Sequence, residues 1–175
     1  ILKFFFRRRL VLRAAGNLYS AAVCQARQPI FYDEYGVADT PDGRFDAILL
    51  HVFLILRRLK GCDQNCIETS QAVFDTMFKD MDQNLREMGA GDMGVSYRIK
   101  DMAKAFYGRI AVYEDGLSRT DNRLESAIKR NVYRNVPVSQ EQIVRLCDYI
   151  RKETDSLAAQ PTEDILQGKL AFSSP

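Results

Sequence analysis

Apolar residues recur every three to four positions along most of this 175-residue chain. That period matches the 3.6-residue turn of an α-helix, and the sequence has no sustained alternation of Val, Ile or Thr with polar residues, the pattern typical of strands. A chain of this length usually forms one domain and hides roughly 70% of its unfolded surface. The sequence therefore predicts an all-α, single compact domain of about six to seven helices with a basic N-terminal segment.

Local signals predict where the helices begin and end. Three start signals stand out, one with a proline at the first helical position and two that resemble capping boxes: Thr40-Pro41-Asp42, Ser118-x-x-Asp121 and Ser139-x-x-Gln142. The expected helices run approximately over residues 10–26, 41–59, 65–88, 96–117, 119–135, 140–158 and 162–167. The helix that begins after Thr40 is apolar on most sides, so we expect it to lie at the centre.

Charge is distributed unevenly along the chain. Six of the 25 basic residues precede Asp33, and all 23 acidic residues lie at or after it. The body is therefore slightly acidic, the reverse of a nucleic-acid-binding domain, and no nucleic-acid partner is expected. The strongly apolar, uncharged run from Ala47 to Leu56 is half the length of about 20 residues that a membrane-spanning helix needs. We expect a chain that does not cross a membrane.

Residues 1–13 form a basic, aromatic segment ahead of a helical domain at 14–170 and a loose tail at 171–175. Aromatic rings beside arginines suit an anionic lipid surface, because the rings enter the interface while the guanidinium groups meet phosphates. Two alternatives remain, namely rings packed on the core and an arginine-rich targeting peptide. The residues expected to contact the membrane are Lys3, Phe4, Phe5, Phe6, Arg7, Arg8 and Arg9.

The sequence offers little for catalysis. His51 is the only histidine, so paired metal sites and a cysteine–histidine nucleophile lose support. Asp82 and Arg86 are four residues apart, acid first, which favours a solvated ion pair over a cation site. The four cysteines are expected to be reduced thiols: Cys24, Cys62, Cys66 and Cys147. These observations predict a binding protein without a catalytic set, a metal or a cofactor.

Three blocks of sequence, in order along the chain, resemble one known family. The first is Pro29-x-Phe31-Tyr32-x-x-x-Gly36-Val37-x-Asp39-Thr40-x-Asp42-Gly43-Arg44-Phe45-Asp46, followed by Leu50-His51 and Arg57-Arg58-Leu59. The second is Phe74-Asp75-x-Met77-Phe78-x-Asp80-Met81-Asp82-x-x-Leu85-Arg86-Glu87-Met88-Gly89-x-Gly91-Asp92. The third is Phe106-Tyr107-Gly108-Arg109, Tyr113 and Arg130-Asn131. Together they are similar to the ubiquinol–cytochrome c chaperone family.

The resemblance implies an all-α protein without catalytic activity that stabilises newly made cytochrome b for assembly into respiratory complex III. Mitochondrial members work with a small helical co-chaperone near the ribosome and the inner membrane. The short chain points to a compact bacterial form, in the cytoplasm and peripheral to the inner membrane (the matrix side if eukaryotic). Two other functions remain open, a general helical adaptor unrelated to cytochrome b and a small enzyme that binds a metal through acids between Asp75 and Glu87.

Eight residues of these blocks are expected to bind partners: Arg44, Asp46, His51, Asp82, Arg86, Glu87, Tyr107 and Arg109. A structural ion-pair network is the alternative for the charged residues, and a buried, hydrogen-bonded imidazole is the alternative for His51. Five methionines bracket the glycine-rich loop around Gly91 and suit an interface that repacks, although they also suit a plain core: Met77, Met81, Met88, Met93 and Met102.

Overall fold

The computed structural model describes the backbone of residues 2–89 and 91–175, and the side chains of residues 6–89 and 91–175. Within these ranges the chain is helical without a strand, which confirms the all-α prediction. The elements are α1 (Leu2–Ala26), α2 (Ile30–Asp33), α3 (Pro41–Leu59), α4 (Gln64–Glu87), α5 (Asp92–Leu117), α6 (Arg123–Ile128), the π-helical turn η1 (Lys129–Tyr133), α7 (Gln140–Ala158) and α8 (Thr162–Leu166).

Helix α3 is the centre of the domain, as the sequence predicts. Every residue from Asp46 to Ile55 is buried, and α1, α4, α5, α7 and η1 all contact this helix. Thr40 caps it, because its Oγ1 accepts a hydrogen bond from the Gly43 N–H at 3.1 Å. The helix ends at Leu59, and Gly61 follows in a left-handed conformation with φ of 80°.

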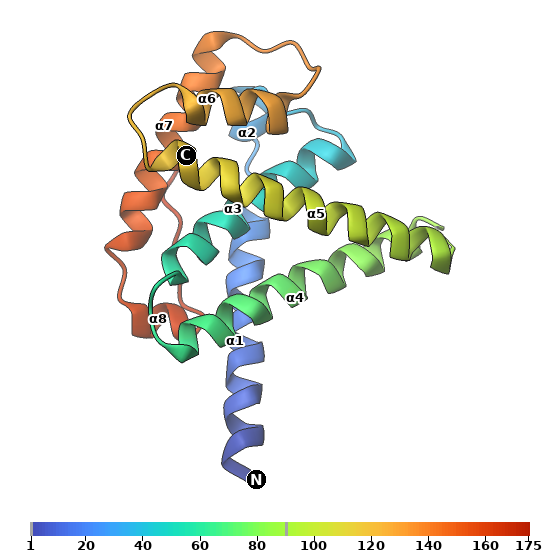
Figure 1. Ribbon diagram of the computed structural model, residues 1–175, viewed down its shortest axis with the longest axis vertical. Coiled ribbons are helices and arrows are strands. Elements are labelled where there is room, and N and C mark those ends of the chain that lie inside the picture. Colours follow the sequence, from blue (N-terminus) through green and yellow to red (C-terminus); the bar gives the residue numbers. More distant parts are fainter. Residues whose placement is uncertain (1, 90) are drawn as a thin grey trace.

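Around α3 the other helices are arranged in two groups. Helix α1 stands upright, with its N-terminal end projecting below the rest of the molecule (Figure 1). Helices α4 and α5 form a long antiparallel hairpin that extends sideways from the body (Figure 1). Helix α7 packs on α3 away from the hairpin tip, and α6 contacts α5 and α7. The hairpin tip therefore lies away from the densest part of the core.

Several boundaries differ from the sequence prediction. The first helix begins at Leu2 and not near residue 10, and the stretch between the first two expected helices contains the one-turn helix α2. Ser139 makes the predicted capping box, with Gln142 N–H bound at 3.2 Å and Gln142 Oε1 accepting from the Ser139 N–H at 3.1 Å. Ser118 does not, since it follows the end of α5, where its hydroxyl donates to the Asp115 carbonyl oxygen at 2.8 Å.

The C-terminal segment, expected to be loose, packs against the body. The backbone N–H of Ser173 donates to both carboxylate oxygens of Glu153, at 3.0 and 3.2 Å, and its carbonyl accepts from Gln25 at 2.8 Å. The side-chain amide of Gln160 exchanges two hydrogen bonds with the Ala171 backbone. The Phe172 ring contacts His51 edge-on, with a centroid distance of 5.2 Å. Fixed polar partners therefore hold this segment between α1 and α7.

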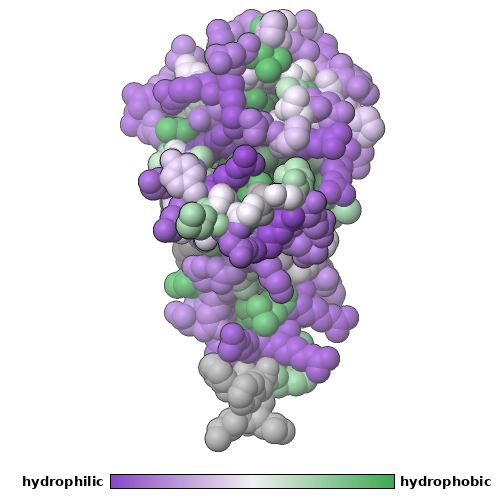
Figure 2. Space-filling view, turned by 90° about the vertical axis from the view of Figure 1, so that its right-hand side faces the viewer, coloured by the Kyte–Doolittle hydropathy of each residue, from purple (hydrophilic) through white to green (hydrophobic). Residues whose placement is uncertain are grey.

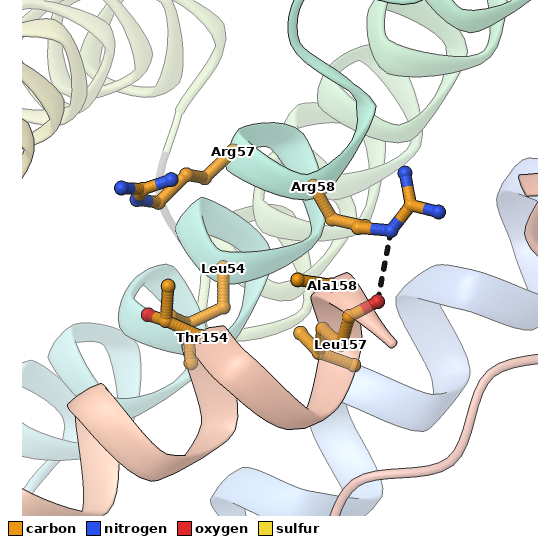
Figure 3. A pocket seen from close by; sticks show the side chains of 6 residues that line it. All are labelled: Leu54, Arg57, Arg58, Thr154, Leu157 and Ala158. Atoms are coloured by element: carbon orange, nitrogen blue, oxygen red, sulfur yellow. Dashed lines mark hydrogen bonds between the residues drawn. The ribbon is translucent and has the colours of Figure 1, made fainter. Parts of the chain in front are cut away.

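The ends of α3 and α7 are joined by Arg58. Its guanidinium donates to the carbonyl oxygens of Leu157 and Gln160, at 2.8 and 2.7 Å, where α7 ends and its last carbonyls lack helical partners. Figure 3 shows Arg58 reaching across to Leu157 beside a hollow of about 310 Å³, whereas Arg57 points to the other side. A cation at the negative end of a helix is favourable, so Arg58 stabilises this junction.

A buried ion cluster ties the start of α3 to the later helices. The Asp46 carboxylate, 2% exposed, receives a hydrogen bond from Arg109 of α5 and lies 2.8 Å from the guanidinium of Arg134, which follows η1. Burial raises the pKa of Asp46 to about 6, while the two arginines oppose that rise. Arg109 also stacks over the Phe45 ring, 5.8 Å from its centroid.

Helices α5 and α6 contact each other closely at Gly116, where there is no room for a side chain. A Cβ atom at this position would lie 2.7 Å from the Leu124 Cα, whereas one at Gly108 of the same helix would meet nothing within 4 Å. We expect Gly116→Ala to lower the free energy of unfolding by about 1–3 kcal/mol, because it overpacks the contact. Gly108→Ala should raise it by roughly 0.5–1 kcal/mol through helix propensity. Urea denaturation measures both, and equal effects would show that the approach is not tight.

The ion cluster generates a second prediction. Arg109→Met leaves Asp46 with only Arg134, whose side chain is 40% exposed, and should lower the free energy of unfolding by about 3 kcal/mol at pH 8. The matched change Arg145→Met breaks an exposed pair with Glu141 and should cost about 0–1 kcal/mol.

The loss in Arg109→Met should shrink toward pH 5. A carboxyl whose pKa is raised in the folded state favours folding below its unfolded-state pKa and loses that contribution as the pH rises through the folded-state value. Below about pH 6 Asp46 can take up a proton and no longer needs a counter-charge. Denaturation curves at pH 5 and pH 8 check this, and a loss that grows toward pH 5 would contradict it.

Candidate functional site

A groove of about 720 Å³ lies between the start of α3, the second half of α4 and the first half of α5. Its apolar residues come from all three helices: Pro41, Phe45, Ile48, Met81, Leu85, Met88, Met102 and Ala105. Met81, Leu85 and Met88 follow one another at helical spacing along α4, so one face of this helix forms a continuous apolar wall. Ile48, Met81 and Leu85 are deeply set, whereas Met88 is 66% exposed at the rim.

The groove carries an excess of positive charge. Five arginines line it against two aspartates: Arg27, Arg44, Arg98, Arg109 and Arg134, with Asp42 and Asp101. Arg109 and Arg134 are committed to Asp46 beneath the surface, and Arg44 donates to Asp39 at 2.6 Å, which lowers the pKa of that carboxyl below its ordinary value. Arg27 and Arg98 have no acidic partner among the residues that the structure describes.

A second hollow of about 420 Å³ adjoins this groove and shares Arg27, Arg44 and Ile48 with it. Its other lining residues belong to the connector between α1 and α3: Pro29, Tyr32, Asp33 and Asp39. The two hollows form one elongated surface from the end of α1 to the hairpin of α4 and α5. We call this surface, defined by the residues that line the two hollows, the arginine-rimmed groove.

Three distant parts of the sequence meet in the arginine-rimmed groove. The block that begins at Pro29 lines the end of the groove beside the end of α1, and the block around Met81 lines one wall. Arg109 of the third block lies at the base of the groove. Their convergence depends on how α4 and α5 pack beside α3. The blocks singled out in the sequence are thus neighbours in space.

The structure separates the eight predicted partner-binding residues into three groups. Arg44 and Arg109 line the groove, and Asp46 lies buried below Arg109. Asp82, Arg86 and Glu87 lie on α4 outside the residues that line the groove; Arg86 bonds Asp82 at 2.6 Å and also pairs with Asp92. Tyr107, on α5, is 60% exposed and packs against Phe74 at a ring-centroid distance of 5.5 Å.

His51 is a core residue and not a surface contact. It is fully buried, and its Nδ1 lies 2.7 Å from the Ala47 carbonyl oxygen, which can only accept, so Nδ1 carries the proton. Its Nε2 therefore accepts from the Tyr149 hydroxyl at 2.9 Å, and that hydroxyl accepts from Gln25 at 3.0 Å. Burial lowers the pKa of His51 to about 4. The prediction of direct partner contact by His51 does not fit this geometry, whereas the buried-imidazole alternative does.

The N-terminal half of α1 is largely uncovered. Phe6 is 67% exposed and Leu10 51% exposed, while Arg7 reaches Glu68 of α4 at 2.8 Å. The predicted contacts Lys3, Phe4 and Phe5 have side chains outside those that the structure describes. Figure 2 shows apolar and polar side chains exposed together above the grey end of the molecule. No helix in the described part of the chain is apolar over enough length to span a bilayer.

Three arginines that line the groove were not identified from the sequence, namely Arg27, Arg98 and Arg134. Arg98 shares a face of α5 with Met102 and Arg109 at helical spacing, a pattern visible in the sequence. Arg27 and Arg134 join the groove only through tertiary packing, and no local signal marks them. Across residues 6–89 and 91–175, no cluster of His, Cys, Asp or Glu side chains is arranged to hold a metal ion.

Known proteins resemble this chain over most of its length. Residues 33–172 match the family described as ubiquinol-cytochrome C chaperone. The ubiquinol-cytochrome-c reductase complex assembly factor 1 of Xenopus laevis is 25% identical over 153 residues, 87% of this chain and 76% of that protein. The Mus musculus protein of that name is 26% identical over the same share of this chain. This chain spans about half of that protein's length, 52%.

A solved structure supports the same relationship. The crystal structure of the Cbp3 homolog from Brucella abortus superposes with a TM-score of 0.85 at 33% identity, covering 99% of this chain and 97% of the other. Because the family match extends over most of the residues and this fold is shared across nearly the whole chain, the protein belongs to the ubiquinol–cytochrome c chaperone family.

Proposed function

We propose that this protein is a non-catalytic chaperone that binds newly made cytochrome b and stabilises it until ubiquinol–cytochrome c reductase is assembled. The relatives named as assembly factors of that complex support a role in its assembly. The observation that carries the proposal for this chain is the arginine-rimmed groove, because it is an accessible, partly apolar surface built from all three motif blocks.

The chemistry of the groove suits a client rich in apolar segments. A newly made membrane protein exposes hydrophobic surface that aggregates unless it is covered. The groove offers Met81, Met88 and Met102, whose unbranched, polarisable side chains adapt to different partners. Met93, at the hairpin tip, is 89% exposed and extends this adaptable surface. We place the bound client segment along these methionines.

Two further contacts belong to the proposal. A small helical co-chaperone would contact residues that lie outside the groove, namely half-buried Asp82 and exposed Arg86, Glu87 and Tyr107. The N-terminal half of α1, with Phe6 and the arginines beside it, would rest on an anionic inner-membrane surface. The second contact would keep the protein peripheral to the membrane in which the client is inserted.

Loss of the protein should lower mature complex III in the source organism without changing transcription of its subunits. Cytochrome b should disappear first, because an unshielded client aggregates or is degraded. Arg86→Glu should impair function more than Lys169→Glu, since Arg86 holds both Asp82 and Asp92 while Lys169 is a peripheral charge near Asp164. The measurement is the reduced-minus-oxidised spectrum of cytochrome b with an immunoblot, and the restored wild-type gene is the control. Normal cytochrome b in the deletion strain, with no second gene covering the loss, would refute the proposal.

Vesicle binding tests the membrane contact. Full-length protein should bind anionic vesicles in a salt-sensitive way, because each cation near such a surface contributes roughly 1 kcal/mol and salt screens it. Replacing Arg8 and Arg9 by Gln should weaken binding roughly thirtyfold. The matched control replaces Lys152 and Lys169 by Gln, at the opposite end of the chain. If both double variants bind equally, α1 is not the membrane contact.

A further inference from the structure

The floor and the rim of the arginine-rimmed groove differ in chemistry. The apolar side chains of α3, α4 and α5, most of them buried or half-buried, form the floor, and the exposed Arg27, Arg44, Arg98 and Arg134 form the rim. We infer that the groove takes an amphipathic helix of a polypeptide partner, with its apolar stripe on the floor and acidic side chains at the arginine rim. The inference rests on the proposed function in treating the groove as the client site, and it names the class of segment that binds.

Charge complementarity sets the acidic character of the segment. Of the lining arginines, the buried Arg109 and the exposed Arg134 already neutralise Asp46, and Arg44 holds Asp39. Arg27 and Arg98 are exposed and have no acidic partner among the described residues. Arg27 follows α1 while Arg98 lies on α5, so two separate elements each present a guanidinium to an occupant. A carboxylate at either position gains a charge-assisted hydrogen bond that an amine would not.

The lining elements also determine the backbone conformation of the segment. The long walls of the groove are helices, whose backbone N–H and C=O groups are paired internally along α4 and α5. No strand edge occurs in the described chain to pair with an extended peptide. A segment buried in this groove must therefore satisfy its own backbone, which a helix does. Helix-in-groove binding uses apolar anchors at three- and four-residue steps, the spacing also found along the α4 wall.

The groove lies far from the basic N-terminal end of α1. Arg27 follows the last residue of that helix, and 25 helical residues span about 37 Å. Figure 1 shows the start of α1 at the lower end of the molecule, away from the tip of the hairpin of α4 and α5. Arg7 pairs with Glu68 near the start of α4, whereas the groove is lined by the second half of that helix. Lipid contact through the start of α1 and peptide binding in the groove therefore use separate surfaces.

The test uses the full chain and three labelled synthetic peptides. One has a leucine stripe and glutamates on its polar face, the second has the same stripe with lysines, and the third scrambles the first so that no stripe forms. Fluorescence anisotropy should show the acidic amphipathic peptide binding at least tenfold more tightly than the other two. Added salt should weaken its binding, and circular dichroism should show helix forming on binding.

Matched charge reversals locate the site. Arg27→Glu with Arg98→Glu should weaken binding of the acidic peptide at least tenfold. Lys100→Glu with Lys104→Glu changes the net charge equally on exposed residues of α5 that do not line the groove, and it should leave affinity within twofold. Thermal unfolding verifies that both variants fold.

Several outcomes overturn the inference. Equal affinity for the acidic and basic peptides would do so, as would equal loss in both double variants. Loss of anionic-vesicle binding in the Arg27 and Arg98 variant, with peptide binding unchanged, would assign the rim to lipid headgroups instead. If the peptide results fail while the deletion strain still loses cytochrome b, the proposed function stands and only this inference falls. If the peptide results hold while the deletion strain keeps normal cytochrome b, the proposed function falls and the inference about the groove stands.

Discussion

The fold depends on burying α3 along most of its length. A helix that is apolar on nearly every side cannot lie on a surface, so its neighbours must enclose it. The two polar side chains that this burial traps, Asp46 and His51, are each satisfied by distant residues: Asp46 by Arg109 and Arg134, and His51 by Tyr149. Each polar contact specifies which later helix lies on which side of α3, in addition to the general apolar packing.

The arginine-rimmed groove exists because the neighbouring helices leave most of the first turn of α3 uncovered. Helix α3 is buried from Asp46 to Ile55, but most of its first turn is exposed, on the side where the hairpin of α4 and α5 extends away from the body. Phe45 and Ile48 consequently meet Met81 and Met102 across a gap and not in close packing. The same Arg109 that neutralises buried Asp46 also lines the gap, so the groove rests directly on the core.

The sequence predicted helix starts correctly where the capping hydrogen bonds join residues that are close together in the chain. Thr40 and Ser139 carry the residues that complete their own hydrogen bonds within three positions, and both caps form. Ser118 has the same spacing, yet α5 continues up to it, and the packing of Gly116 on Leu124 determines where the chain turns. The site was predictable only in part. Arg44 and Arg109 lie within motif blocks, whereas Arg27 and Arg134 enter the groove through contacts with residues far along the chain.

The segment at 171–174 is held mainly through its backbone, so its position depends little on which side chains it carries. Gln160 binds the main chain of Ala171, and Glu153 and Gln25 bind the main chain of Ser173, so most of the recognition is directed at groups that nearly every amino acid carries. Only the ring of Phe172 and the hydroxyl of Ser173 are recognised as side chains. Related chains can therefore differ at 171 without losing this attachment, with proline as the exception because it lacks the N–H that Gln160 accepts. A sequence alignment of such chains would show a variable segment, although the same backbone hydrogen bonds attach it to the body.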